Sequence, residues 1–83
     1  MDLAKVKVSD VLNSVKKLKI SDADIEATCK ICHGTQLLTD TTMTTDGEDT
    51  VYTCKNGCGP IVKVEKQEIG YSLMVIGHLS YEK

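Results

Sequence analysis

The apolar positions in the first quarter of the chain follow a helical period. Valine and leucine recur at intervals of three and four residues, at Val8, Val11, Leu12, Val15 and Leu18. This spacing is typical of one face of an α-helix. Ser9 is a typical N-cap residue, and the lysines that follow Val15 suit the negative end of the helix dipole. The pattern predicts a helix over about residues 9–19.

A second start signal for a helix follows directly. Ser21 and Asp24 have the spacing of a capping box, with aspartate in the role usually taken by glutamate. Ile20 and Ile25 stand at the two positions that form a hydrophobic staple around such a box. These residues predict a short helix over about residues 22–27, which ends at the first cysteine pair.

The pattern changes to that of strands after residue 34, where threonine, valine and tyrosine become frequent. Alternation of apolar and polar positions, with turn residues between the segments, predicts four strands. They cover about residues 36–45, 50–53, 61–66 and 71–81. In the last of these, Leu73, Val75, Leu79 and Tyr81 share one face, and Met74, Ile76 and His78 share the other.

Helices first and strands afterwards indicate the α+β class. We expect a single domain over residues 1–83, with a helical N-terminal segment (1–27), a cysteine-containing β core (28–60) and a C-terminal β-hairpin (61–83). The hairpin is expected to pack on the N-terminal helix. All the strand pairing is expected to be antiparallel.

Composition shows why this chain needs an additional source of stability. The 83 residues include no Phe, no Trp and three Tyr, so large core side chains are scarce, and chains of this size are marginal without a staple. The first residues contain no apolar stretch typical of a signal peptide, and no apolar run approaches bilayer length. We therefore expect a cytoplasmic protein with no membrane partner.

Four cysteines form two pairs in similar local sequences. Thr-Cys-Lys-Ile-Cys-His-Gly contains Cys29 and Cys32, and Thr-Cys-Lys-Asn-Gly-Cys-Gly contains Cys54 and Cys58. A tight turn with a cysteine near each end presents two thiolates to one metal ion, and two such turns complete a tetrahedral set of four sulfur ligands. The spacing therefore predicts one structural Zn²⁺ ion held by all four cysteines.

Other chemistries of these cysteines are weaker alternatives. Two disulfides suit an exported protein, and a redox Cys-x-x-Cys motif suits a βαβ setting. Covalent haem on Cys29-Lys30-Ile31-Cys32-His33 leaves the second pair without a role. Iron in the four-sulfur site stays open beside zinc, and whether His33 assists the metal also stays open.

With these two pairs the chain resembles the zinc-ribbon (zinc β-ribbon) group. The resemblance covers residues 28–60, and implies two cysteine turns, or knuckles, that clamp one structural zinc around a hairpin at residues 36–53. The chain departs from the family pattern in two places. The second pair has three intervening residues, and His33 stands where the family often has glycine.

Charge and the filled metal shell limit the function. There are no Arg residues and the formal net charge is −2, with seven acids and one lysine in residues 21–50. Four cysteines leave a metal no open position for a substrate, so we expect no enzymatic activity and no small-molecule substrate. We expect a protein-interaction or regulatory module: a regulator, an assembly factor or a phage-type inhibitor of a larger machine.

The alternative is a nucleic-acid-binding zinc ribbon of a transcription, replication or translation system. Lysine neutralises phosphate even where arginine is missing. The contacts expected on this alternative are the lysines of the N-terminal segment, namely Lys5, Lys7, Lys16, Lys17 and Lys19.

Overall fold

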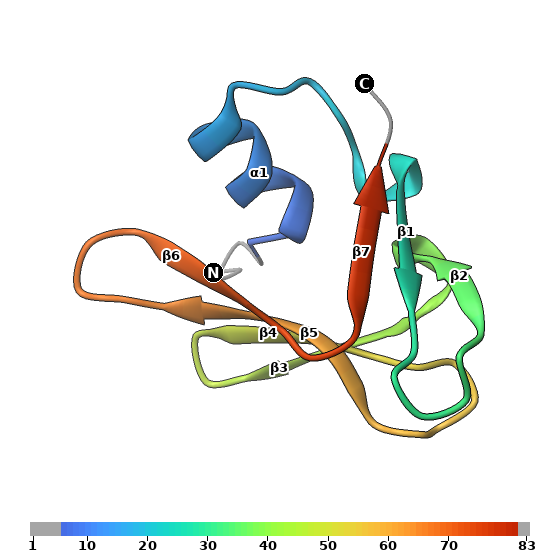
Figure 1. Ribbon diagram of the computed structural model, residues 1–83. Helices are drawn as coiled ribbons and strands as arrows, with labels where there is room; N and C mark the ends of the chain where they lie inside the picture. Colours follow the sequence, from blue (N-terminus) through green and yellow to red (C-terminus); the bar gives the residue numbers. More distant parts are fainter. Residues whose placement is uncertain (1–5, 82–83) are drawn as a thin grey trace.

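A computed structural model describes residues 6–81 as one helix and seven strands in two antiparallel sheets (Figure 1). The bounds of the elements are α1 Val8–Lys16, β1 Ile25–Thr28, β2 Thr35–Leu37, β3 Thr42–Asp46, β4 Asp49–Thr53, β5 Pro60–Lys66, β6 Tyr71–Val75 and β7 His78–Tyr81. The strand order is β2-β1-β7 in the smaller sheet and β3-β4-β5-β6 in the larger one. One helix with antiparallel sheets agrees with the predicted α+β class.

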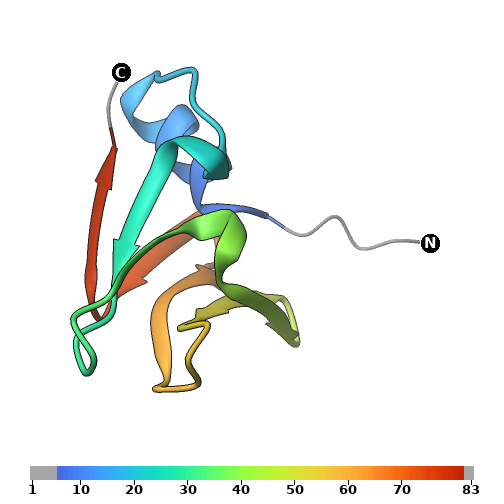
Figure 2. The same ribbon diagram turned by 90° about the vertical axis from the view of Figure 1, so that its right-hand side faces the viewer.

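The two sheets are joined by the continuous segment that runs from β6 into β7. The helix α1 lies in the angle between these strands, and the two cysteine-containing loops lie at the opposite corner (Figures 1 and 2). The core between them is built from aliphatic side chains and one tyrosine, with Val8, Ile25, Leu38, Tyr52, Ile61, Val62 and Val64 almost fully buried. α1 contacts β6, as expected for a helix packed on the C-terminal strands.

The N-terminal helix is shorter than predicted and begins earlier. Its N-cap is Lys7 rather than Ser9, and the backbone N–H of Lys7 donates to the Asp10 carboxylate at 3.0 Å. The helix ends at Lys16 because Lys17 adopts a left-handed conformation with φ of 54°. The amide of Asn13 then bonds both the N–H and the carbonyl of Ile20, which turns the chain back along the helix.

The predicted second helix over residues 22–27 is wrong beyond Asp24. The capping box is present, because the backbone N–H of Ser21 donates to the Asp24 carboxylate at 2.9 Å, but it starts only a 3₁₀ turn, Asp22–Asp24. Ile25 and Ala27 are fully buried on alternate positions of β1, which is the central strand of the smaller sheet. Pairing on both edges of β1 therefore overrides the local helix signal.

Two predicted strands are each divided in the structure. The strand predicted over residues 36–45 is broken by a 3₁₀ turn, Leu38–Asp40, which places Leu38 in the core. The strand predicted over 71–81 is broken at residues 76–77, where both N–H groups donate to the carbonyl of Ile61. The segment 61–83 is therefore not one hairpin: β6 pairs with β5, whereas β7 pairs with β1.

Gly77 is required at this break between β6 and β7. A Cβ atom at residue 77 would overlap the carbonyl oxygen of Thr28, so only glycine allows the start of β7 to approach the end of β1 so closely. The predicted faces of the segment are largely retained. Leu73, Leu79 and Tyr81 pack against the core, whereas Val75 is 46% exposed.

A buried polar link holds the start of α1 against the larger sheet. The Tyr52 hydroxyl donates to the Asp22 carboxylate at 2.9 Å and accepts from the backbone N–H of Val8 at 3.2 Å. The other Asp22 oxygen accepts from the backbone N–H of Ser9 at 3.1 Å. Burial raises the pKa of Tyr52 far above its usual value, so the hydroxyl stays protonated and keeps donating.

We expect Tyr52→Phe to lower the free energy of unfolding by about 1–3 kcal/mol, because a buried carboxylate oxygen and a backbone N–H both lose their partner. Urea unfolding of the metal-loaded protein measures this cost. Tyr71→Phe is the matched control, because Tyr71 is 37% exposed and its loss of a hydroxyl should change little. Equal midpoints for the Tyr52 variant and the wild type would show that the link contributes nothing.

Candidate metal centre

The first cysteine loop connects β1 to β2 and forms a closed turn. The backbone N–H of Cys29 donates to the carbonyl of Gly34 at 3.0 Å, and the N–H of His33 donates to the carbonyl of Cys29 at 2.9 Å. His33 has a φ of 60°, in the left-handed region that favours glycine. The loop therefore folds back within six residues and places Cys29 and Cys32 on the same side.

The second loop connects β4 to β5 and repeats this turn. The backbone N–H of Cys54 donates to the carbonyl of Gly59 at 2.9 Å, and the N–H of Gly57 donates to the carbonyl of Cys54 at 2.8 Å. In both loops the closing bond joins a cysteine to the glycine five positions later, because 34 − 29 and 59 − 54 are equal. The extra residue between Cys54 and Cys58 is therefore accommodated without lengthening the turn.

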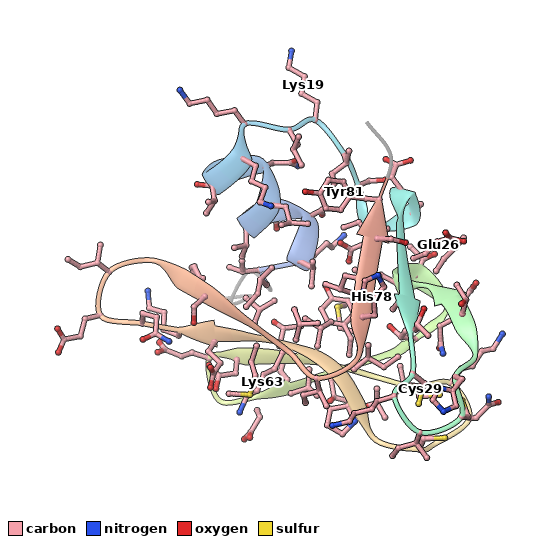
Figure 3. All side chains as sticks on the ribbon, viewed as in Figure 1. Lys19, Glu26, Cys29, Lys63, His78 and Tyr81 are labelled. Carbon is pink, nitrogen blue, oxygen red and sulfur yellow. The ribbon has the colours of Figure 1, made fainter. Side chains whose placement is uncertain are left out.

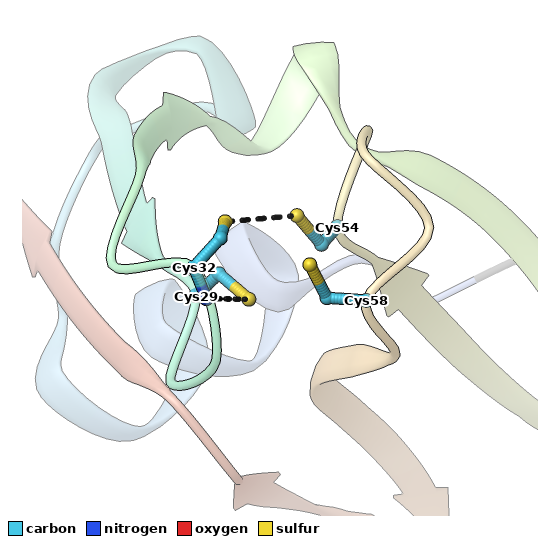
Figure 4. Close-up of side chains that lie close together, drawn as sticks. All are labelled: Cys29, Cys32, Cys54 and Cys58. Carbon is cyan, nitrogen blue, oxygen red and sulfur yellow. Dashed lines mark hydrogen bonds between the residues drawn. The ribbon is translucent and has the colours of Figure 1, made fainter.

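The four cysteine sulfurs converge between the two loops (Figure 4). All four Sγ atoms lie within 4.8 Å of one another, and those of Cys32 and Cys54 are 3.8 Å apart. A tetrahedral site with metal–sulfur bonds of about 2.3 Å has sulfur–sulfur edges of about 3.8 Å. A disulfide needs about 2.05 Å, and all four cysteines are free thiols. The predicted ligands are thus brought together in a set that can hold a metal ion.

Burial differs among the four sulfur ligands. Cys29 and Cys54 are buried at 3% and 1% exposure, Cys58 is half-buried and Cys32 is exposed. The centre therefore has a closed inner wall, formed where the two sheets meet, and an open outer side at Cys32.

Hydrogen-bond donors lie around the sulfurs of Cys29, Cys32 and Cys54. The backbone N–H groups of Ile31 and Cys32 lie 3.4 and 3.5 Å from Cys29 Sγ. The Asn56 amide donates to Cys32 Sγ at 3.8 Å. Donors of this kind stabilise metal-bound thiolates and fix their orientation.

Gln36 is a functional residue that the sequence analysis missed. Its side-chain amide donates to Cys54 Sγ at 3.5 Å, and its carbonyl oxygen accepts from the backbone N–H of Lys55 at 3.0 Å. It is buried at 5% exposure on β2, directly after the first loop. Gln36 therefore ties the first loop to the second, and no spacing rule points to it before the two loops are placed together.

The metal-free thiols differ in acidity because of these surroundings. The backbone N–H of Asn56 and the Gln36 amide lower the pKa of Cys54 to about 6, and the backbone N–H of Gly34 lowers the pKa of Cys32. Hydrogen bonding to Cys32 and burial raise the pKa of Cys58 to about 12. Cys54 thus ionises more readily than Cys58, so that a metal ion must displace a proton from Cys58.

The candidate nucleic-acid contacts do not gather at this centre. Lys16, Lys17 and Lys19 are exposed together at the C-terminal end of α1. Lys7 is at the other end of the helix, about 14 Å away along its axis. Lys5 lies outside the described residues. Figure 3 shows Lys19 at the opposite end of the molecule from Cys29.

The two histidines lie beside the centre rather than in it. His33 is exposed on the first loop. His78 is exposed at the start of β7 (Figure 3). Within the described residues, the set of side chains that can share a metal ion contains the four cysteines and neither histidine.

Comparisons of the chain with protein-family models, with curated proteins and with solved structures gave no match. Among residues 6–81, no helix is long and apolar enough to cross a membrane.

We expect Gln36→Met to weaken zinc binding by about 10–100-fold, the usual cost of losing a partner of a metal ligand. Competition with a chelating dye measures the affinity. Gln67→Met is the matched control, because Gln67 is exposed in the turn between β5 and β6. Unchanged affinity in the Gln36 variant would show that its bond to Cys54 has no effect on the metal.

Proposed function

We propose that the chain binds one structural Zn²⁺ through Cys29, Cys32, Cys54 and Cys58 and acts as a non-enzymatic protein-interaction module. The observation that carries this is the convergence of four thiols within 4.8 Å of one another from two similar turns. Four soft sulfur ligands favour Zn²⁺ or iron over hard cations. Zinc is preferred because four cysteines form the closed shell of a structural zinc site.

The zinc-ribbon resemblance is part of this proposal. It is supported by two knuckles closed by the same backbone hydrogen bond and by the hairpin of β3 and β4 between them. The hairpin is shorter than the expected 36–53, because β2 pairs with β1 in the other sheet. The two knuckles thus link two sheets, and this suits a scaffold whose surfaces must hold a fixed relative position.

Formal charge favours a protein partner over nucleic acid. The metal-free chain carries −2 with neutral cysteines. One Zn²⁺ and four thiolates add +2 and −4, so the loaded protein carries −2 + 2 − 4 = −4. A negative protein without arginine is poorly suited to a phosphate backbone. A regulator, an assembly factor or an inhibitor of a larger machine fits these properties.

A nucleic-acid role has one supporting observation. Lys16, Lys17 and Lys19 border a shallow hollow at the C-terminal end of α1, where they form a local positive surface. Such a surface can neutralise a few phosphates.

The two functions differ in an electrophoretic mobility-shift assay with generic DNA and RNA. We expect the zinc-loaded protein to cause no shift at about 0.15 M salt and to be captured with a discrete protein partner from a lysate of its source. Tight binding of nucleic acid that weakens steeply with salt, and that is lost in Lys16→Gln/Lys17→Gln/Lys19→Gln, would instead establish the nucleic-acid role.

Metal removal tests the zinc proposal directly. Structural zinc contributes on the order of 10–16 kcal/mol in small sites at neutral pH, as much as the whole stability of a typical domain, about 5–15 kcal/mol. We expect EDTA, or Cys54→Ser, to collapse the strand signal in circular dichroism and the amide dispersion of residues 29–66. Thr53→Ser is the neighbouring control. Full dispersion in a reduced, chelated sample would contradict the proposal.

Acid should also release the metal, because a cysteine binds a metal ion as the thiolate and a proton competes for the same sulfur. Because the folded pKa of Cys54 is lowered from 9.0 to about 6, the stability it gives is complete above pH 9.0 and is lost as the pH falls through 6. The raised pKa of Cys58 acts in the opposite sense: its contribution is present below pH 9.0 and is lost as the pH rises through about 12. Protons compete with zinc for both sulfurs, so the zinc affinity should decrease steadily as the pH is lowered. A zinc indicator dye would report this decrease.

A further inference from the structure

One edge of the larger sheet is formed by β6. This strand, Tyr71–Val75, is last in the order β3-β4-β5-β6, and no strand of residues 6–81 pairs with its outer side. An unpaired edge presents a row of backbone N–H and C=O groups to which another strand can add. The side of β6 that faces away from β5 is therefore a surface on which a further strand can be bound.

The hydrogen bonds at the two ends of β6 identify the backbone groups that face this edge. The N–H of Gln67 donates to the carbonyl of Gly70 at 3.0 Å, and the N–H of Ile76 donates to the carbonyl of Ile61 at 2.8 Å. Along an antiparallel pair, residues that bond the partner strand alternate with residues that face away from it. Positions 70, 72, 74 and 76 thus bond β5. The residues whose N–H and C=O point to the free edge are Tyr71, Leu73 and Val75.

The side chains of β6 do not protect this edge. No charged residue occurs from position 69 to position 77, and Tyr71, Met74 and Val75 are 37%, 47% and 46% exposed. Proteins usually blunt an exposed edge with charged residues, proline or a bulge. The opposite edge of the sheet follows this rule, because β3 ends in Asp46 and begins two residues after Asp40. Of these two edges, β6 is the apolar and uncharged one.

We propose that two copies of this chain pair through β6, antiparallel and about a two-fold axis at Leu73, so that their larger sheets form one continuous sheet. This inference goes beyond the proposed function, because it names a second copy as the partner of this edge and uses neither the metal nor another protein.

The register follows from the groups that face outward. With the axis at Leu73, this residue lies opposite its own copy, and Tyr71 lies opposite Val75 of the second copy. Each of these residues then exchanges both backbone hydrogen bonds with its counterpart. A shift of two residues in either direction leaves outward-facing groups of both strands without a partner. The axis at Leu73 is therefore the position that satisfies the whole edge.

The side chains that meet in this register also suit one another. Tyr71, Leu73 and Val75 share the face of the sheet that carries the buried Val62 and Val64. On that face an aromatic ring lies opposite a β-branched side chain, which is a favourable cross-strand pair. On the other face, Ser72 lies opposite Met74 of the second copy, so no like charges meet within the paired strands.

Self-complementarity favours a second copy over a foreign strand. A two-fold contact uses the same surface on both chains, and it closes once two chains are joined. The acidic residues beside β3 make the other edge of the sheet a poor acceptor for a further copy. The expected assembly is therefore a dimer and not a filament.

The first test is sedimentation velocity of the purified full chain at increasing concentration. We expect the mass to rise from that of one chain at about 1 µM to that of two chains at about 1 mM, the range of weak to moderate complexes. Val75→Lys should keep the mass at one chain, because an edge lysine opposes strand addition. Thr45→Lys adds the same charge to exposed β3 and should leave the dimer unchanged.

Three outcomes of this test overturn the proposal. They are a mass of one chain at every concentration, assemblies larger than two chains, and a Val75→Lys variant that dimerises like the wild type.

Amide hydrogen exchange locates the interface without a substitution. In a sample with about nine-tenths of the chains paired, the amides of Tyr71, Leu73 and Val75 should exchange about tenfold more slowly than in a dilute sample, because only unpaired chains exchange them. The amides of Ser72 and Met74 bond β5 in both samples and should change less. Unchanged exchange at the first three amides in a dimeric sample overturns the proposal.

A mixed sample of ¹³C-labelled and unlabelled chains tests the register. We expect intermolecular nuclear Overhauser effects between the Tyr71 ring of one copy and the Val75 methyl groups of the other. Contacts between the two Tyr71 rings instead would show parallel pairing and would overturn the two-fold arrangement.

Failure of this inference is separable from failure of the proposed function. A chain that dimerises through β6 but captures no other protein supports the dimer and contradicts the interaction module. A chain that stays monomeric and captures a partner does the reverse.

Discussion

The geometry of this protein depends on four sulfur atoms that meet between two sheets. Cys29 and Cys32 lie in the loop between β1 and β2 of the smaller sheet, and Cys54 and Cys58 lie in the loop between β4 and β5 of the larger one. A metal bound there joins elements distant in sequence, and it does so at the corner away from α1 (Figure 1). Without a metal, Cys54, whose pKa is lowered, and Cys58, whose pKa is raised, lie within one group of four close sulfurs.

The opposite corner is held by a different interaction. The hydroxyl of Tyr52 and the carboxylate of Asp22 satisfy the first free N–H groups of α1, which have no partner inside a helix. Tyr52 is on β4, two residues before Cys54, so the strand that supplies a buried sulfur at one end also anchors the helix. β4 thus connects the candidate metal centre to the start of α1 within a few residues.

The sequence predicted the parts of this structure that depend on local chemistry. The spacing of Val8, Val11 and Leu12 predicted the buried face of the helix. The spacing of the cysteines predicted the four sulfurs that lie together in the structure. It failed where distant pairing decides the outcome. Ile25 follows a good capping box and still joins a strand, because β1 is paired on both edges. Gln36 bridges the loops through contacts to residues 54 and 55, which only the folded chain brings near.

The two loops have equal lengths but different cysteine positions, and this difference gives the metal centre its polarity. The closing bond joins the first cysteine of each loop to the glycine five positions later. The second cysteine is the fourth residue of the first loop, Cys32, and the fifth residue of the second loop, Cys58. Cys32 is exposed, whereas Cys58 is half-buried. Cys32 is therefore the most exposed of the four candidate ligands. Asn56, from the other loop, donates to this same sulfur and supports the weakest side of the shell. The centre is thus closed toward the core, where Cys29 and Cys54 are buried, and open at one candidate ligand, Cys32.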